Sequence, residues 1–362
     1  MTVRRIPAAE AVAALARFDA VIDARSPSEF ADDHLPGALN WPTLDDAERA
    51  AIGTEYKQVS AFAARKRGAA IAARNIAAHI ERELPDKPRS WRPLVYCWRG
   101  GQRSAALATV LDAIGFPVHV LDGGYRAFRG HVIDHLEALP LGLPLVVLAG
   151  RTGSAKSRLL QALAARGEQV LDLEALACHR GSVLGPLPGR PQPSQKAFET
   201  ALWQALRGLD RQRPVWAESE SRTIGRLRVP EALLGALRAA RCVTVQMPLE
   251  ARVAFLLDDY GHFVDDTAAF CERLAALREL RGAGVVERWQ ALARAARHAE
   301  VVRELLEQHY DPVYERSMAR NFAGYAAADR LDLPAADGAA LDAAAAALVR
   351  LIGRDAHPRV AA

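Results

Sequence analysis

Two segments about fifty residues apart each join an apolar run, an anion-binding type of loop and the start of a helix. In the first, residues 97–104 follow the apolar residues 94–96; in the second, residues 150–157 follow residues 145–148. A loop between a strand and a helix directs backbone N–H groups at an anion, and the helix dipole adds partial positive charge. The chain is therefore expected to fold as two α/β units with one such loop in each.

The remaining pattern supports parallel sheets with flanking helices. Further short strands are expected within residues 19–24, 117–121, 169–172, 214–218 and 241–246, separated by helical segments such as 44–83. This alternation is typical of α/β folds. We expect an N-terminal domain over residues 1–138. A second domain over residues 139–362 should be P-loop-like, with a C-terminal part that is mostly helical beyond residue 250.

Composition excludes several classes of protein. The 362 residues carry a net charge of +4, which permits an RNA partner without requiring one. Four cysteines lie without a C-x-x-C pair, so neither a disulfide framework nor a cysteine zinc site is expected. No apolar stretch has the length of a signal peptide or a membrane span. These features predict a cytoplasmic protein without a membrane partner.

Cys97 is the candidate nucleophile of the first loop. Two successive glycines allow the following N–H groups to turn inward, Arg103 adds a fixed charge, and the helix N-terminus lies beside the sulfur. This environment favours the thiolate. We name Cys97 and Arg103 as catalytic candidates, and as the surrounding chalcogen or oxyanion loop Trp98, Arg99, Gly100, Gly101, Gln102 and Ser104.

The second loop matches the phosphate-binding pattern G-x-x-x-x-G-K-[ST], with Ala155 in place of the second glycine. Alanine is tolerable there if the position is helical. Lys156 would bridge phosphate oxygens and Ser157 could reach Mg²⁺. The sequence does not decide whether Mg²⁺ is required. The expected phosphate-binding residues are Gly150, Thr152, Gly153, Ser154, Ala155, Lys156 and Ser157. No metal ligand is assigned.

Six further polar residues are supporting candidates. Glu218 ends an expected strand, where a P-loop hydrolase would place an acidic residue. Only five lysines occur in this arginine-rich chain, which draws attention to a lysine in a polar loop. The set is His179, Arg180, Lys196, Glu218, Arg222 and Arg252. For each of the polar clusters around them, a solvated loop is the alternative.

The N-terminal half resembles the rhodanese family over residues 23–30, 34–40, 97–104 and 121–125. The resemblance adds Asp23 and Arg25 as supporting candidates and implies a persulfide, or its selenium analogue, on Cys97. Five residues separate Cys97 from Arg103, whereas single-domain rhodaneses tend to have four. The related phosphatases have the longer loop, which fits a tetrahedral oxyanion. Cys97 could therefore attack a phosphate ester, or the loop could accept a chalcogen donor that carries phosphate.

Nearly the whole chain, roughly residues 5–325, resembles the tRNA 2-selenouridine synthase family. The matching segments are residues 53–58, 64–70, 96–104, 179–182, 191–195 and 218–225. The resemblance implies a transferase that converts wobble 2-thiouridine of tRNA to 2-selenouridine with selenophosphate. It also implies an S-geranyl intermediate made from geranyl diphosphate, which would bind at Lys156 and Ser157. An enzyme that supplies selenophosphate is a candidate partner, and DNA is not expected as one.

Two alternatives remain at this stage. A sulfurtransferase fused to a nucleotide-dependent P-loop module would use thiosulfate or a persulfide and hydrolyse ATP or GTP. A non-catalytic scaffold would leave both anion sites without a purpose. For tRNA, the basic residues within 57–74 are a candidate surface, and a solvated helix face is the alternative there.

Overall fold

The computed structural model describes residues 3–182, 185–187, 189–261 and 265–355. The chain forms two compact units, each with its own sheet. The first comprises Met1–Leu136 and Pro193–Trp203, and the second comprises Glu137–Gln192 and Gln204–Ala362. Nothing in the sequence pattern indicates that Pro193–Trp203 returns to the first unit.

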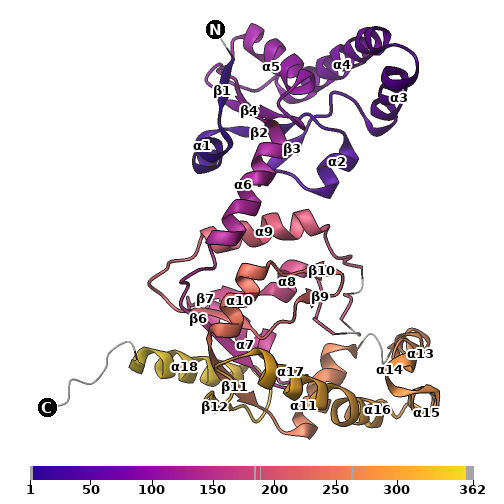
Figure 1. Ribbon diagram of the computed structural model, residues 1–362, viewed down its shortest axis with the longest axis vertical. Coiled ribbons are helices and arrows are strands. Elements are labelled where there is room, and N and C mark those ends of the chain that lie inside the picture. Colours follow the sequence, from indigo (N-terminus) through magenta and orange to yellow (C-terminus); the bar gives the residue numbers. More distant parts are fainter. Residues whose placement is uncertain (1–2, 183–184, 188, 262–264, 356–362) are drawn as a thin grey trace, which may run out of the picture. The chain divides into compact units, whose positions relative to one another are not determined.

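The first unit is built on a parallel sheet with the strand order β1-β5-β4-β2-β3 (Figure 1). The central strand β4 is buried along its whole length, in keeping with its apolar sequence. The strands of this sheet are β1 (Arg4–Ile6), β2 (Ala20–Asp23), β3 (Ala38–Asn40), β4 (Pro93–Tyr96) and β5 (His119–Leu121).

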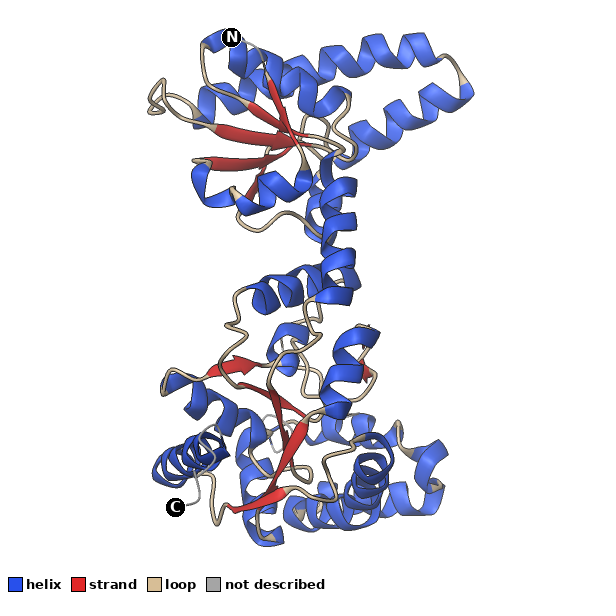
Figure 2. Cartoon of the chain, turned by 60° about the vertical axis from the view of Figure 1, so that its left-hand side comes forward, coloured by secondary structure: helices blue, strands red, loops and turns tan. Residues whose placement is uncertain are grey.

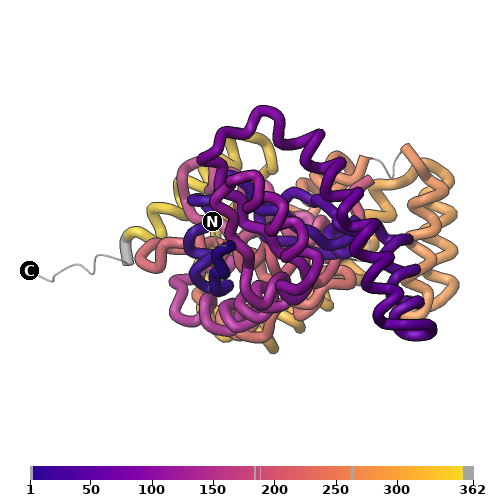
Figure 3. Tube along the Cα trace, turned by 90° about the horizontal axis from the view of Figure 1, so that it is seen from above, coloured from indigo at the N-terminus to yellow at the C-terminus, as the bar shows by residue number. Residues whose placement is uncertain are grey.

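Helices flank this sheet (Figure 2). Ser26, Pro27 and Glu29 start α2 through a capping box with proline at the first turn. The expected helical stretch 44–83 is two helices, α3 and α4, which pack as an antiparallel pair (Figure 3). The helices are α1 (Ala8–Ala13), the 3₁₀ turn η1 (Leu15–Arg17), α2 (Pro27–Asp32), α3 (Asp46–Gln58), α4 (Ala61–Glu83), α5 (Gln102–Ile114), α6 (Gly124–Ala138) and the start of α9 (Gln195–Arg207).

The second unit has its own parallel sheet, ordered β12-β11-β6-β8-β7. Strand β6 is central and fully buried, so the loop that follows it lies at the middle of the carboxyl edge, where α/β sheets bind ligands. The strands are β6 (Leu145–Ala149), β7 (Gln169–Leu171), β8 (Val215–Glu218), β11 (Arg241–Gln246) and β12 (Asp329–Asp332), beside a small hairpin of β9 (Thr223–Ile224) and β10 (Leu227–Arg228).

The helices of the second unit cover its sheet and extend into a helical C-terminal part. They are α7 (Lys156–Ala165), α8 (Leu173–Ala177), the end of α9, α10 (Glu231–Ala239), α11 (Leu249–Asp259), α13 (Thr267–Ala275), α14 (Arg278–Arg281), α15 (Ala283–Arg294), α16 (His298–Leu305), the π-helical turn η2 (Leu306–Tyr310), α17 (Asp311–Asn321) and α18 (Gly338–Asp355). Within the described residues, every helix is too short or too polar to cross a bilayer.

The predicted fold class is confirmed: both units are parallel sheets with flanking helices. Strand β12 was missed because its sequence Asp-Arg-Leu-Asp alternates at a half-exposed sheet edge and contains one apolar residue. The Gly/Pro-rich segment 181–193 is an irregular loop where described; residues 183, 184 and 188 lie outside the described residues.

Candidate active sites

The cysteine loop lies where sequence reasoning placed it, between β4 and α5. Cys97 Sγ is 3.1 Å from Ser104 Oγ, and only 3% of the Cys97 surface is exposed. Gly100 has φ +66°, and a Cβ there would lie 2.9 Å from the carbonyl oxygen of Leu121. Glycine is therefore required at this point of the loop.

The chain after β5 braces the loop from one side. The N–H of Tyr125 donates to the carbonyl of Cys97 at 2.8 Å, and the N–H of Arg126 donates to that of Trp98 at 3.0 Å. The Trp98 and Tyr125 rings stack with their centroids 5.4 Å apart. These contacts hold the loop closed around the sulfur, while the side chains of Arg99 and Gln102 stay exposed.

Arg103 makes an ion pair inside the first unit. Its Nη1 donates to Glu29 Oε2 at 2.6 Å. Burial of Glu29 favours its neutral form, but the hydrogen bonds and charge of Arg103, together with hydrogen bonds from Ser26, outweigh burial, so the pKa of Glu29 lies below its ordinary value. An anion bound by Arg103 would compete with this carboxylate. The catalytic role of Arg103 stays a prediction.

Asp23 and Arg25 form a buried ion pair. The guanidinium donates to both Asp23 oxygens, at 2.6 to 3.0 Å, and to the carbonyl of Asp33 at 2.6 Å. It also lies 3.9 Å from the centre of the Tyr125 ring. With its donors committed in this way, Arg25 supports the sheet beneath the cysteine loop.

The phosphate loop connects β6 to α7, and two of its residues, Gly153 and Ala155, have left-handed backbone conformations. A Cβ on Gly153, at φ +81°, would lie 2.9 Å from Leu256 Cδ1 on α11. Ala155 adopts φ 55° and ψ 30°, the left-handed conformation. The condition for a strain-free alanine, a right-handed helical position, is therefore not met, and a left-handed alanine carries a steric cost of about 1–2 kcal/mol.

Lys156 and Ser157 open α7 beside the loop. Lys156 Nζ donates to the carbonyl of Gly150 at 2.8 Å, and Ser157 Oγ donates to Glu174 at 3.2 Å. The Tyr314 hydroxyl accepts from the N–H of Gly150 at 2.6 Å, and burial raises the pKa of Tyr314 to about 12. Among the described residues, Ser154 Oγ is buried without a hydrogen-bond partner. The loop thus offers an unused hydroxyl next to a cation.

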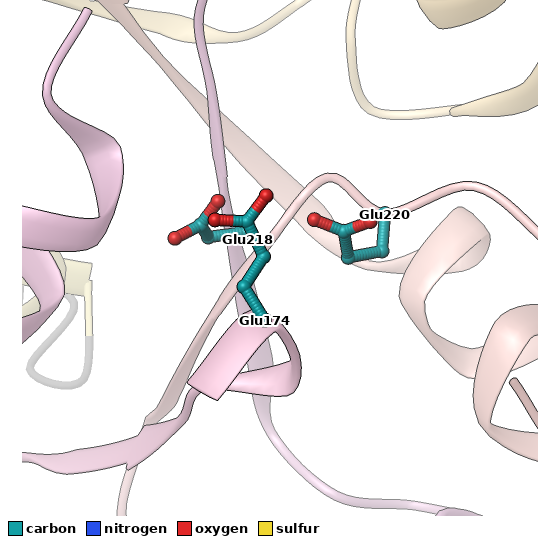
Figure 4. Close-up of side chains that lie close together, drawn as sticks. All are labelled: Glu174, Glu218 and Glu220. Atoms are coloured by element: carbon teal, nitrogen blue, oxygen red, sulfur yellow. The ribbon is translucent and has the colours of Figure 1, made fainter. Parts of the chain in front are cut away.

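Three carboxylates gather beside Lys156 and Ser157: Glu174 from α8, Glu218 at the end of β8, and Glu220 just after it (Figure 4). Their ligand atoms lie within 4.8 Å of one another. Burial and then mutual repulsion raise the pKa of Glu174 to about 9 and of Glu220 to about 8, and burial also raises that of Glu218. Glu218 Oε1 lacks a hydrogen-bond partner among the described residues.

A cleft of the second unit contains the phosphate loop and these carboxylates, with about 600 Å³ open to the centre of a water molecule. His179 and Arg180 also line it. His179 Nδ1 accepts from the N–H of Gly181 at 3.1 Å, and burial followed by the charge of Arg273 lowers the pKa of His179. Arg180 is paired with Asp259 at 3.1 Å.

The other three candidate cations are each paired with a carboxylate. Arg252 is buried, binds both carboxylate oxygens of Asp311, and donates to the carbonyl of Thr152 at 3.0 Å. Lys196 belongs to the first unit and pairs with Asp32 at 2.7 Å, and exposed Arg222 pairs with Glu231 at 3.3 Å. Arg252 therefore braces the phosphate loop through its backbone.

Comparison with known proteins matches both units. Residues 143–283 match the family model of the tRNA 2-selenouridine synthase AAA domain, and residues 7–131 match that of the rhodanese-like domain. The tRNA 2-selenouridine synthase of Alcanivorax borkumensis is 34% identical over 333 residues, which cover 83% of this chain and 90% of that protein. The chain belongs to the tRNA 2-selenouridine synthase family.

Two other members of the family give similar figures. The protein from Nitrosomonas europaea is 37% identical over 244 residues, 66% of this chain and 63% of its own. That from Shewanella piezotolerans is 32% identical over 347 residues, 87% of this chain and 93% of its own. The resemblance predicted from the sequence motifs is thereby confirmed.

Sequence reasoning missed Glu174, Glu220 and Tyr314 in this member of the family. Glu220 lies in the polar run Glu-Ser-Glu-Ser-Arg at residues 218–222, and this run directly after a strand could have pointed to it. Glu174 lies in an apolar segment and Tyr314 lies far along the chain, so no local pattern distinguishes either residue. Only the arrangement of β8, α8 and α17 brings all three to the phosphate loop.

Proposed function

We propose that this protein, acting on tRNA in the cytoplasm, converts wobble 2-thiouridine to 2-selenouridine with selenophosphate, through an S-geranyl intermediate made from geranyl diphosphate. One observation carries the proposal: a single chain holds a buried cysteine in an anion-binding loop and, in a separate unit, a phosphate loop beside three carboxylates. The two loops suit two successive reactions on the same base.

Geranylation is assigned to the second unit. The thiocarbonyl sulfur of the base attacks C1 of the geranyl group, and the C–O bond to diphosphate breaks as the C–S bond forms. Negative charge then collects on the leaving diphosphate. The N–H groups of the loop, the Lys156 ammonium and the free Ser154 hydroxyl are placed to stabilise that charge.

Mg²⁺ fits the group of carboxylates. Glu174, Glu218 and Glu220 supply oxygen donors within 4.8 Å of one another, and Glu218 Oε1 has no hydrogen-bond partner among the described residues. Ser157 Oγ adjoins Glu174. When bound there, Mg²⁺ would neutralise charge on the departing diphosphate. The protein's own part is to hold these three carboxylates together next to Lys156. Because the pKa values of Glu174 and Glu220 are raised, binding of the cation would release protons from them.

Selenation is assigned to the Cys97 loop, and electron balance limits what Cys97 can do. Selenium in selenophosphate is already at the selenide level of the product, so a perselenide on Cys97 would require an oxidant that neither substrate supplies. Selenium instead adds at C2 of the base and expels the geranyl thiol. The Cys97 thiolate then accepts the phosphoryl group: an S–P bond forms, the Se–P bond breaks, and water releases phosphate.

The five-residue spacing from Cys97 to Arg103 supports this role, because that loop length suits a tetrahedral oxyanion. Ser104 Oγ, 3.1 Å from the sulfur, can donate to the thiolate. The side chain of Arg103 would exchange Glu29 for the phosphoryl group.

The exposed end of the α3–α4 pair is assigned to tRNA binding. Lys57, Arg65 and Lys66 are exposed there, and the Lys66 ammonium lies 5.0 Å from the Phe62 ring, which is 68% exposed. Cations next to accessible aromatic rings suit phosphates and unstacked bases. Arg67 and Arg74 contribute less net charge, because each pairs with a glutamate.

Nucleoside mass spectrometry on 2-thiouridine tRNA tests the proposal. Geranyl diphosphate alone should give S-geranyl-2-thiouridine, and adding selenophosphate should give 2-selenouridine. Cys97→Ala should retain geranylation and accumulate the Se-phosphorylated nucleoside, whereas Cys178→Ala, another free cysteine, should behave as wild type. Lys156→Ala should weaken pyrophosphate binding about 10- to 100-fold through the lost charge-assisted contact, and exposed Lys87→Ala should not.

Unchanged nucleosides with a folded sample would refute the proposal. ATP or GTP hydrolysis by such a sample would favour the sulfurtransferase fused to a nucleotide-dependent module. Loss of both steps in a folded Cys97→Ala variant would refute the division of labour between the two units.

A further inference from the structure

A narrow apolar cavity lies among the C-terminal helices of the second unit, and the reactions described so far do not use it. About 50 Å³ of the cavity is open to the centre of a water molecule. Its wall surface is almost entirely apolar, and the apolar side chains come from helices α11, α13 and α16 and the turn η2: Leu256, Leu257, Phe270, Val302, Leu305 and Leu306.

One end of the cavity is the phosphate loop itself. Thr152 lines both the cavity and the polar cleft that contains Lys156, and so do Tyr260 and Tyr310. The contact between Gly153 and Leu256 leaves no intervening layer between the loop and α11. A ligand with its phosphates on the loop can therefore extend directly into the cavity.

The cavity follows one face of α16 and η2 from this mouth. Tyr310, Leu306, Val302 and His298 succeed one another at helical spacing, and His298 does not line the polar cleft. A rise of about 1.5 Å per residue puts Tyr310 and His298 about 18 Å apart along the axis. At the His298 end, the imidazole lies 6.1 Å from the Phe270 ring. The cavity is thus a slot that leads away from the phosphate loop.

We propose that this slot holds the hydrocarbon chain of the prenyl diphosphate whose phosphates bind the Lys156 loop. The inference rests on the geranylation assigned above and adds the chain's binding site and the residues that limit its length. A narrow carbon-walled slot suits an acyclic chain. A nucleobase would find few partners for its polar edge, because the wall surface is almost entirely apolar. Val302, part-way along the slot, sets the length that can enter.

Calorimetry on the full-length protein without tRNA tests this inference, with pyrophosphate, dimethylallyl diphosphate, geranyl diphosphate and farnesyl diphosphate as probes. Burial of each methylene strengthens binding about fourfold, so geranyl diphosphate should bind at least tenfold more tightly than pyrophosphate. Val302→Trp should remove most of that gain while leaving pyrophosphate and dimethylallyl diphosphate unchanged. Val302→Ala, a milder change, should shift preference toward the longer farnesyl chain.

Gln308→Trp, an exposed position on η2, adds the same bulk outside the slot and should leave all four affinities unchanged. Equal geranyl affinity in wild type and both Val302 variants would overturn the slot assignment, even if S-geranyl-2-thiouridine still forms. If wild type binds geranyl diphosphate no more tightly than pyrophosphate and forms no S-geranyl nucleoside, the proposed function itself fails. ATP binding abolished by Val302→Trp would assign the slot to a nucleotide and likewise overturn the inference.

Discussion

Replacing Arg252 with lysine separates two roles for a buried cation next to the phosphate loop. Arg252 is 2% exposed, and its guanidinium donates to the carbonyl of Thr152 at 3.0 Å and to Asp311 at 2.7 and 2.8 Å. It ties α11, α17 and the loop together. If Arg252 instead bound phosphate directly, lysine would preserve the charge and most of the function.

The size of the effect follows from those three hydrogen bonds. A lysine ammonium is a point donor and cannot span both Asp311 oxygens and the loop carbonyl. Losing one charge-assisted hydrogen bond completely and weakening a second by half, at about 1.5–3 kcal/mol for each full bond, should destabilise the second unit by about 2–4 kcal/mol. Arg252→Ala would leave buried Asp311 with only the half-exposed guanidinium of Arg151, 3.7 Å away, and should cost up to about 3–5 kcal/mol.

Hydrogen exchange followed by mass spectrometry on the full chain measures this loss segment by segment. Peptides from β6 and α7 should exchange about 30- to 1,000-fold faster in Arg252→Lys, while those from β2 and β4 in the first unit stay unchanged. Arg166→Lys is a matched control, because Arg166 binds Asp342 with two hydrogen bonds at the surface and should cost under about 1 kcal/mol. Wild-type exchange in Arg252→Lys, combined with weaker pyrophosphate binding, would refute the bracing role.

Three further predictions concern single features of the two units. Ala155→Gly should raise the free energy of unfolding of the second unit by about 0.5–1 kcal/mol, because relief of left-handed strain exceeds the entropy cost of glycine. Denaturant titration measures this change, and a destabilised variant would contradict it. Arg25→Met should destabilise the first unit by about 3–5 kcal/mol, speed hydrogen exchange in β2 and β4, and leave geranylation intact. The double variant Asp23→Leu with Arg25→Met should recover part of that stability. Equal hydrogen exchange in the single and double variants would count against the ion pair. Replacing the exposed cations of the α3–α4 pair by alanine should lower the slope of log tRNA affinity against log salt by about two to three; the cations are Lys57, Arg65 and Lys66. Lys87→Ala is the control, and an unchanged slope would place the tRNA elsewhere.

Much of the site could be predicted from the sequence because it is encoded locally. Cys97 with its two glycines, and Gly150 through Ser157, each occupy one strand–loop–helix unit, and the structure places both at the carboxyl edge of a parallel sheet. Glu218 was found for the same reason, as the end of a recognisable strand. The roles assigned to these residues stay predictions.

Charged candidates were harder to interpret, because a sequence does not show which opposite charge a side chain meets. Three candidate site residues are each paired with a carboxylate of another element or loop: Lys196 with Asp32, Arg222 with Glu231, and Arg252 with Asp311. Glu29, the partner of Arg103, is 74 residues away in sequence. Such pairs arise from packing between elements and leave no periodic signal.

The sequence by itself determined two parallel α/β sheets and their two anion-binding loops, because apolar strands, glycine-rich turns and helix starts act over a few residues. Tertiary structure decided which groups surround each loop. It gathered Glu174, Glu218 and Glu220 beside Lys156, set Ala155 in a left-handed conformation, and packed α11 against α16 around an apolar slot. Those outcomes depend on contacts between segments far apart in the chain, where close packing rather than local backbone preference decides the geometry.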